Sequence, residues 1–110
     1  MTAIFETIQD HLNTYPIVLY MKGTKRAPLC GFSGTVVQIL SRLGAEFHDV
    51  NVLEDLEIRQ GIKDFTNWPT IPQLYIQGEF IGGADIVREM YESGDLKSLL
   101  EEKGIVIVNT

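Results

Sequence analysis

The chain has 110 residues, of which 45% are apolar and 22% are charged. This length and mixture are typical of a single globular domain, spanning residues 1–110, and they exclude a disordered chain. The formal net charge of -6 disfavours nonspecific binding to nucleic acid or to an anionic membrane surface.

Cys30 is the only cysteine in the chain. A lone cysteine excludes an internal disulfide and is typical of a reducing compartment. The sequence starts without a charged-then-apolar signal pattern, and no apolar run approaches the length of a membrane span. We therefore expect a cytoplasmic protein that binds neither nucleic acid nor a membrane.

The first predicted elements are a helix and a buried strand. Apolar residues recur at helical spacing at Ile4, Phe5, Ile8 and Leu12. This helix is expected to begin after Thr2, a candidate N-cap, and to end before Pro16. Ile17–Met21 is apolar throughout and partly β-branched, which predicts a strand buried on both faces.

A helix, a strand and a further helix follow. Apolar spacing predicts a helix over residues 34–43, closed by Gly44 as a C-cap. Residues 46–52 favour a strand, and residues 55–65 favour a helix. A helix between two such strands predicts a right-handed crossover that joins parallel strands.

The second half of the chain has a different pattern. Residues 73–76 and 79–82 flank a Gln-Gly pair, which predicts an antiparallel hairpin. Helical spacing returns over residues 86–100 with one break, and the place of the apolar tail, residues 105–108, stays open. Together the elements predict an α/β protein with a thioredoxin-like fold, a four-stranded mixed sheet with helices on both faces.

Cys30 lies between the first strand and a helix. Free N–H groups and the positive dipole end of a helix favour the thiolate, so Cys30 can act as a nucleophile or as a metal ligand. Cys-Gly-Phe-Ser has the outline of a C-x-x-C redox motif in which Ser33 replaces the second cysteine. An oxidised Cys30 must therefore pair with an external thiol. The alternative is a buried, inert cysteine.

A second informative stretch is Trp-Pro-Thr-Ile-Pro at positions 68–72, just before the third strand. Pro72 is a candidate cis proline, which turns the N–H and C=O of Ile71 toward an extended peptide ligand. An ordinary rigid turn is the alternative. Trp68 is expected in the core rather than at a binding surface.

A third stretch is Gly-Gly-Ala-Asp at positions 82–85, where a helix begins. Free N–H groups there can hold a carboxylate while Asp85 takes an amine, although Asp85 as the N-cap of a simple turn is the alternative. Lys22 and Arg59 are candidate clamps for a carboxylate. Alternatively, Arg59 pairs with Asp55 on the surface and Lys22 is merely solvated.

Taken together, these residues resemble the monothiol glutaredoxins that have a Cys-Gly-Phe-Ser active site. The resemblance runs from about residue 2 to residue 104 and rests on residues 21–24, Pro28, residues 30–33, 59–63, 68–75 and 82–85. It implies glutathione as the ligand, with Lys22 and Arg59 at its glycine carboxylate. Ile71 then pairs main chain to main chain with the cysteine of the tripeptide, and Ala84 and Asp85 hold its γ-glutamyl end.

Two departures from the family pattern stand out. Lys25 and Arg26 stand where members often have proline and an acid, which is expected to add positive charge beside the site. Ala84 stands where many have cysteine or serine, which removes a possible second thiol but is expected to leave the backbone contacts intact.

The family is also associated with a [2Fe-2S] cluster. Such a cluster typically needs four thiolates, whereas one chain offers only Cys30. The resemblance therefore implies a homodimer bridged by the cluster, with each Cys30 as a metal ligand and two glutathione sulfurs as the others. The implied function is the assembly of iron–sulfur clusters and their transfer to apo iron–sulfur proteins, with a BolA-like protein as a further partner.

Two other functions stay open. One is a glutathione-dependent thiol–disulfide oxidoreductase, in which Cys30 attacks a glutathionylated protein and a second glutathione resolves the mixed disulfide. The other is a thioredoxin-like interaction module with an idle thiol.

Overall fold

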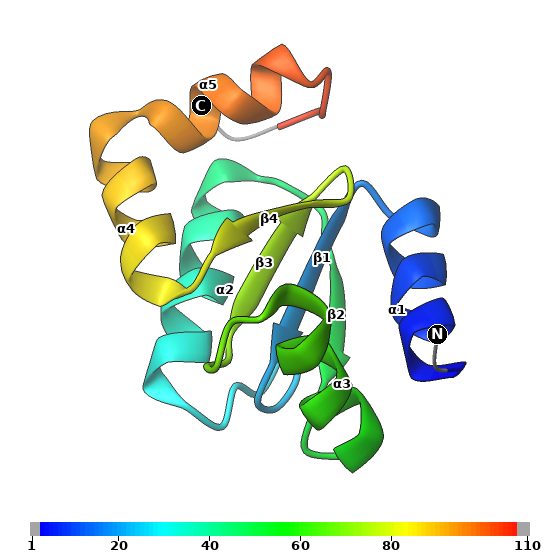
Figure 1. Cartoon of the computed structure of the whole chain (residues 1–110). Helices are drawn as coiled ribbons and strands as arrows, with labels where there is room; N and C mark the ends of the chain where they lie inside the picture. Colours follow the sequence, from blue (N-terminus) through cyan, green and yellow to red (C-terminus); the bar gives the residue numbers. More distant parts are fainter. Residues whose placement is uncertain (1–2, 108–110) are drawn as a thin grey trace.

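The computed structural model describes residues 3–107, which form one mixed sheet flanked by helices (Figure 1). The elements, in chain order, are α1 (Ala3–Thr14), β1 (Ile17–Met21), α2 (Gly31–Leu43), β2 (His48–Asn51), α3 (Leu56–Thr66), β3 (Gln73–Ile76), β4 (Glu79–Gly82), α4 (Ala84–Ser93) and α5 (Asp95–Glu102). The strand order in the sheet is β2-β1-β3-β4. The predicted α/β class and thioredoxin-like architecture are confirmed.

The pairing of the strands follows from their connections. β1 and β2 are parallel and are joined through α2, whereas β1 with β3 and β3 with β4 are antiparallel. The predicted hairpin between β3 and β4 turns at Gln77 and Gly78, which both have positive φ angles of 49° and 81°. Two positive φ angles in a two-residue connection match the twist of the flanking strands.

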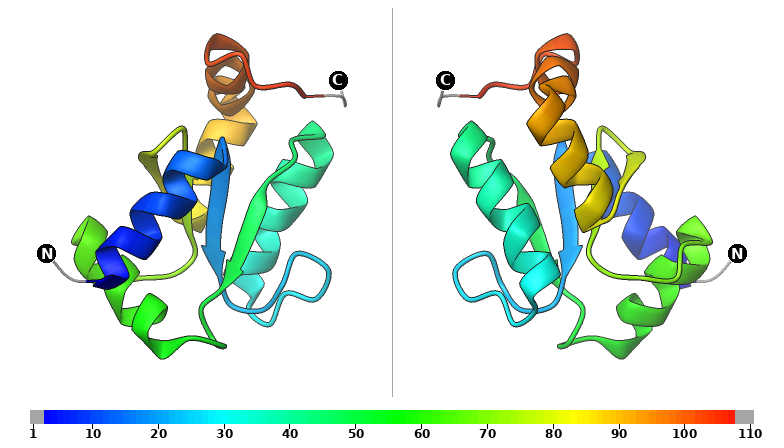
Figure 2. Two further views of the ribbon diagram at one scale, coloured as in Figure 1. Left: turned by 90° about the vertical axis from the view of Figure 1, so that its right-hand side faces the viewer. Right: turned by 90° about the vertical axis from the view of Figure 1, so that its left-hand side faces the viewer.

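The sheet separates two apolar cores, one on each face (Figure 2). Ile17, Leu19 and Met21 of β1 face α2, α4 and α5, whereas Val18 and Tyr20 face α1 and α3. All five residues of β1 are buried, which confirms the prediction of a strand covered on both faces. Such alternation makes β1 the rigid centre from which the next loop emerges.

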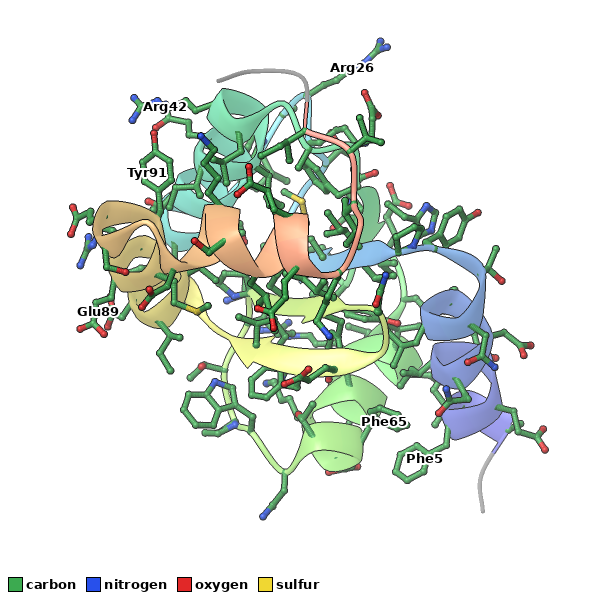
Figure 3. All side chains as sticks on the ribbon, turned by 90° about the horizontal axis from the view of Figure 1, so that it is seen from above. Phe5, Arg26, Arg42, Phe65, Glu89 and Tyr91 are labelled. Atoms are coloured by element: carbon green, nitrogen blue, oxygen red, sulfur yellow. The ribbon has the colours of Figure 1, made fainter. Side chains whose placement is uncertain are left out.

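Helices α1 and α3 pack closely on one face. The rings of Phe5 and Phe65, labelled in Figure 3, meet edge to face with centroids 5.5 Å apart. A Cβ atom at Gly61 of α3 would lie 2.8 Å from the Ile4 side chain, so this contact requires glycine. Among the described residues, no helix is long and apolar enough to cross a membrane.

Several element boundaries differ from the prediction. The helix expected over residues 34–43 begins at Gly31, and the strand expected over residues 46–52 is limited to His48–Asn51. Ile107 of the apolar tail forms an isolated bridge with Ala45, while Val108 lies outside the described residues. The candidate N-cap Thr2 lies outside them as well.

Candidate functional site

A pocket of about 450 Å³ lies beyond the carboxyl end of β1, and Cys30 lines it. Lys22 and Phe32 line it on the side of Cys30, residues 68–72 form the opposite wall, and the start of α4 forms another part. Segments that are distant in the sequence therefore converge on one thiol. Lys22, Cys30, Ile71, Ala84 and Asp85, all predicted from the sequence, are brought together here.

Cys30 is the N-cap residue of α2, with an extended backbone (φ -150°, ψ 136°), and its side chain is partly exposed. The pKa of Cys30 lies below its ordinary value, mainly because the backbone N–H of Ser33 stabilises the thiolate. The N–H of Phe32, the Ser33 hydroxyl and the ammonium of Lys22 act in the same direction, and partial burial opposes them. The thiol forms no side-chain capping hydrogen bond of ordinary geometry, so these N–H groups act chiefly on the thiolate form. Because the side chain is partly exposed, a buried cysteine is excluded.

Ser33 occupies the place of a second cysteine, but it is fully buried. Its hydroxyl oxygen accepts a hydrogen bond of 3.1 Å from the backbone N–H of Lys22. This bond ties the first turn of α2 to the end of β1. Ser33 therefore supports the loop and offers no second thiol for disulfide exchange.

The loop between β1 and Cys30 is held in a narrow turn. Gly23 has a positive φ of 91°, and a Cβ atom there would lie 2.5 Å from the Ala27 carbonyl oxygen, so glycine is required. The Gly23 N–H donates to the Asn51 side chain at 3.0 Å, and the Leu29 N–H donates to the Lys22 carbonyl at 3.0 Å. These bonds fix the approach of the chain to Cys30.

Lys25 and Arg26 do not line the pocket, contrary to the expectation that they add charge beside it. The Lys25 ammonium lies over the Phe47 ring, 4.4 Å from its centroid, and donates to the Phe47 carbonyl. Its backbone N–H donates to Asp49 at 2.8 Å. Arg26 is exposed and extends away from the body of the molecule (Figure 3). The loop turns both side chains toward β2 or solvent because its backbone is anchored on that strand.

The wall opposite Cys30 contains the predicted cis bond, between Ile71 and Pro72. Trp68 is 37% exposed and lines the pocket, with its ring centroid 5.7 Å from that of Phe80. The expectation that Trp68 belongs to the core was wrong, because the chain turns outward after α3 ends at Thr66. Trp68 thus gives the pocket an aromatic surface.

The start of α4 lies on the pocket and carries no side-chain cap. The N-cap is Gly83 and not Asp85, so the alternative in which Asp85 is the N-cap of a simple turn is excluded. The first backbone bond of the helix runs from Val87 N–H to Gly83 C=O at 3.0 Å, which leaves the earlier N–H groups of the helix open. Asp85 is exposed, and its carboxylate lies 3.4 Å from the Arg88 guanidinium. These open N–H groups can donate hydrogen bonds to an anion, and the Asp85 carboxylate can attract a cation.

Arg59 is not among the residues that line the pocket, whereas Lys63 is. The two lie one helical turn apart on α3, so they share a face of the helix. No salt bridge joins Arg59 to Asp55, whose carboxylate instead caps α3 by accepting from the N–H groups of Glu57 and Ile58. Sequence reasoning missed Lys63, although its i+4 spacing from Arg59 was available as a signal.

Ile86 also lines the pocket and was missed by sequence reasoning. The other lining residues, Phe32, Pro69, Thr70, Pro72 and Gly83, lie in the three stretches that the sequence singled out. Phe32 and Leu29, on either side of Cys30, are 63% and 69% exposed. The thiol therefore lies in an apolar rim beside a cationic lysine pair and an open helix end. Within residues 3–107, no group of three or more His, Cys, Asp or Glu side chains can hold a metal ion. The single cysteine means that each chain offers only one thiolate.

Known proteins resemble this chain in sequence. The glutaredoxin family model matches residues 17–81. A protein of Rickettsia conorii named "Probable monothiol glutaredoxin 2" is 55% identical over 97 residues, covering 88% of this chain and 91% of that protein. "Monothiol glutaredoxin-5, mitochondrial" of Saccharomyces cerevisiae is 51% identical, covering 92% of this chain and 69% of that protein.

Solved structures show the same arrangement of the whole chain. A monomeric truncated mutant of Trypanosoma brucei 1-C-Grx1 is 39% identical with a TM-score of 0.89, covering 100% of both chains. Reduced poplar apo GrxS14 is 52% identical with a TM-score of 0.81, covering 91% of this chain and 92% of that one. A buckwheat glutaredoxin–glutathione complex is 26% identical with a TM-score of 0.82, covering 94% and 92%.

Proposed function

Because this chain belongs to the glutaredoxin family, among its monothiol members, we propose that it binds glutathione beside Cys30 and acts in the assembly and transfer of [2Fe-2S] clusters. The observation that carries the proposal is the position of Cys30 in a pocket between cationic side chains and an open helix N-terminus. A tripeptide with a carboxylate at each end and a thiol between them has matching chemistry. The solved buckwheat glutaredoxin–glutathione complex supports this choice of ligand.

In the proposed complex, glutathione spans the pocket. Its glycine carboxylate lies toward Lys22 and Lys63, with Arg59 one turn along α3 as a further cation. Its cysteine pairs with the main chain of Ile71. Its γ-glutamyl carboxylate accepts from the open N–H groups at Ala84 and Asp85, while the Asp85 carboxylate attracts its ammonium.

The cluster is proposed as cargo held between two chains. Two Cys30 thiolates and two glutathione thiolates supply the four ligands that a [2Fe-2S] cluster takes. The exposed side chains of Leu29 and Phe32 support this homodimer, since a second chain would cover apolar surface beside the sulfur. Apo iron–sulfur proteins are the proposed recipients, a BolA-like protein is a further proposed partner, and the cytoplasm is the proposed location.

Disulfide exchange is the second candidate function, and the lowered pKa and partial exposure of Cys30 favour it. The Cys30 thiolate attacks the glutathione sulfur of a glutathionylated protein, which releases the protein thiolate and forms a Cys30–glutathione disulfide. A second glutathione thiolate then attacks that disulfide, which forms oxidised glutathione and restores the Cys30 thiolate. Ser33 carries no thiol, so it forms no disulfide in either step.

Anaerobic reconstitution with iron, sulfide and glutathione separates the two functions. We expect a coloured dimer that reverts to a colourless monomer when glutathione is removed, and no colour with Cys30→Ser. A colourless monomer that rapidly reduces a glutathione mixed disulfide would instead support the exchange function. A variant that retains Cys30 but replaces exposed Arg26 with Gln is the matched control and should load normally.

A further inference from the structure

Gln73, the first residue of β3, is fully buried although its side chain is polar. Within residues 3–107, and apart from tyrosines, the only other polar side chain buried to this degree is that of Ser33. A primary amide carries two donor hydrogens and an acceptor oxygen, and burying them without partners is costly. The neighbours of Gln73 therefore show what it holds in place.

Both amide hydrogens of Gln73 are used on the wall of the pocket. The Nε2 atom donates to the Trp68 carbonyl at 3.1 Å and to the Thr70 carbonyl at 3.2 Å. The Oε1 atom accepts from the Tyr75 hydroxyl at 2.9 Å. Because carbonyls only accept, they fix the orientation of the amide. Burial raises the pKa of Tyr75, so its hydroxyl stays protonated and remains a donor.

The end of α3 supports the same segment. The Thr66 hydroxyl lies 3.2 Å from Gln73 Oε1 and 2.8 Å from the Ile62 carbonyl, and its single proton can serve only one of them at a time. Its oxygen accepts from the Trp68 N–H at 3.2 Å. Trp68 is thus held through its N–H by α3 and through its C=O by β3.

Residues 68–72, which these hydrogen bonds hold in place, form the pocket wall opposite Cys30. Trp68, Thr70 and Ile71 line the pocket, but Gln73 does not. Residues 67–72 belong to no helix or strand, so the Gln73 amide replaces the hydrogen bonds that regular structure would supply. Loss of this amide would free the carbonyls on either side of Pro69 and let the wall move relative to the thiol.

From these contacts we propose that Gln73 is a positioning residue, which sets the Trp68–Thr70 wall at the distance from Cys30 that glutathione binding requires. The proposal rests on the proposed glutathione function of the pocket. It assigns Gln73 no contact with the ligand, because the side chain acts through two main-chain carbonyls beneath the wall.

Gln73→Met, Gln73→Glu and Tyr75→Phe together test this assignment. Gln73→Met keeps the length of the side chain and removes both donors together with the acceptor, whereas Tyr75→Phe leaves both donors in place, removes the bond to Oε1 and is the matched control. Trp68 is the only tryptophan, so its fluorescence reports on the wall during a titration with reduced glutathione. Iodoacetamide alkylation of Cys30 in the absence of glutathione monitors the thiol separately.

We expect Gln73→Met to weaken glutathione binding about tenfold and Tyr75→Phe to weaken it less than about twofold. The alkylation rate of Cys30 should stay at the wild-type value in both variants. In Gln73→Glu, the buried carboxyl has a raised pKa and donates only when protonated. Its affinity relative to wild type should therefore recover from pH 8 toward pH 5, a profile that a purely structural defect would not give.

The proposal is overturned if folded Gln73→Met binds glutathione within about twofold of wild type. If this variant does not fold, a pH-independent affinity ratio for Gln73→Glu overturns it instead. Failure of the proposed function appears differently, as a wild-type chain that does not bind glutathione. In that case the indole N–H resonance of Trp68 in the free protein tests whether Gln73 positions the wall. The resonance should shift in Gln73→Met and not in Tyr75→Phe, and an unchanged resonance in Gln73→Met would overturn the positioning role.

Discussion

The N-terminus of α3 differs from those of α2 and α4. At α3, the Asp55 carboxylate accepts from the N–H groups of Glu57 and Ile58 at 3.0 and 3.2 Å. At α2 and α4 the N-cap residues are Cys30 and Gly83, and neither forms a side-chain capping bond. The two open ends line the pocket, whereas none of the residues at the capped end does.

At the pocket the fold gives up local stability in favour of binding, although the N-terminus of α5 at Gly94 also lacks a side-chain cap without lining the pocket. A good N-cap is worth about 1 kcal/mol, so the absence of a side-chain cap at α2 and α4 has a real cost. In return, the free N–H groups of α2 favour the Cys30 thiolate, and those of α4 remain available for an anion. At α3, whose N-terminus lies outside the pocket, Asp55 caps the helix.

The largest expected effect comes from removing one open donor while keeping the helix. Ala84→Pro deletes the first N–H of α4, and proline is tolerated at this position because Gly83 is already extended. We expect glutathione affinity to fall roughly 10- to 100-fold, because a hydrogen bond to a charged group contributes about 1.5–3 kcal/mol. Isothermal titration calorimetry measures the change.

Leu56→Pro is the matched control for this prediction. It deletes the first N–H of α3, to which Asp55 does not bind, and the leucine side chain is exposed. Glutathione affinity should stay within about twofold of wild type. Equal losses in both proline variants would contradict the idea that the open end of α4 binds the ligand.

A smaller effect is expected from the cations on α3. Lys63→Gln should weaken glutathione binding about two- to fivefold, because an exposed charge contributes up to about 1 kcal/mol. Arg59→Gln should weaken it less, since Arg59 does not line the pocket. Titrations at low and high salt measure both changes, and the difference between variant and wild type should shrink at high salt.

Arg42→Gln is the charge-matched control for these variants. Arg42, labelled in Figure 3, lies in the last turn of α2, at the end of the helix remote from Cys30. Its replacement should leave affinity unchanged. A larger loss for Arg59→Gln than for Lys63→Gln would mean that the glycine carboxylate lies farther along α3 than the pocket wall indicates.

Removing the cap of α3 should affect stability without affecting binding. Asp55→Ala is expected to lower the free energy of unfolding by about 1 kcal/mol, or the melting temperature by about 4 °C. Thermal unfolding followed by circular dichroism measures this change. Glutathione affinity should remain at the wild-type value, and a clear loss of affinity would show that the capped end also contributes to the site.

The smallest expected effect is on the titration of Cys30. Because its pKa is lowered in the fold, alkylation of the native chain should reach half of its maximal rate at a lower pH than in the urea-unfolded chain. The same shift stabilises the fold above the pKa of the unfolded cysteine, and this contribution is lost as pH falls through the folded pKa. Ser33→Ala should move the midpoint upward, and an unchanged midpoint would exclude a role for the hydroxyl.

Some predicted boundaries were displaced for physical reasons. The start of α2 was predicted three residues too late because Gly31, Phe32 and Ser33 have no apolar helical spacing, and the burial of Ser33 depends on its bond to Lys22. Residues 46–52 look like one long strand, but only His48–Asn51 pairs with β1. In both cases the local sequence pattern predicts one boundary, whereas hydrogen bonds to a residue distant in the sequence set the observed one.

The sequence by itself determined the order of helices and strands, the position of Cys30 before a helix, and the Ile71–Pro72 and Gly83–Ala84 stretches, because periodicity, helix ends and proline act over a few residues. Only the tertiary structure decided that Lys63 and Trp68 line the pocket, that Lys25 turns away, and that Gln73 lies beneath the wall. These placements depend on how α3 and β3 pack across the sheet. Packing brings together side chains that are far apart in the sequence, and their spacing along the chain does not indicate their distance in space.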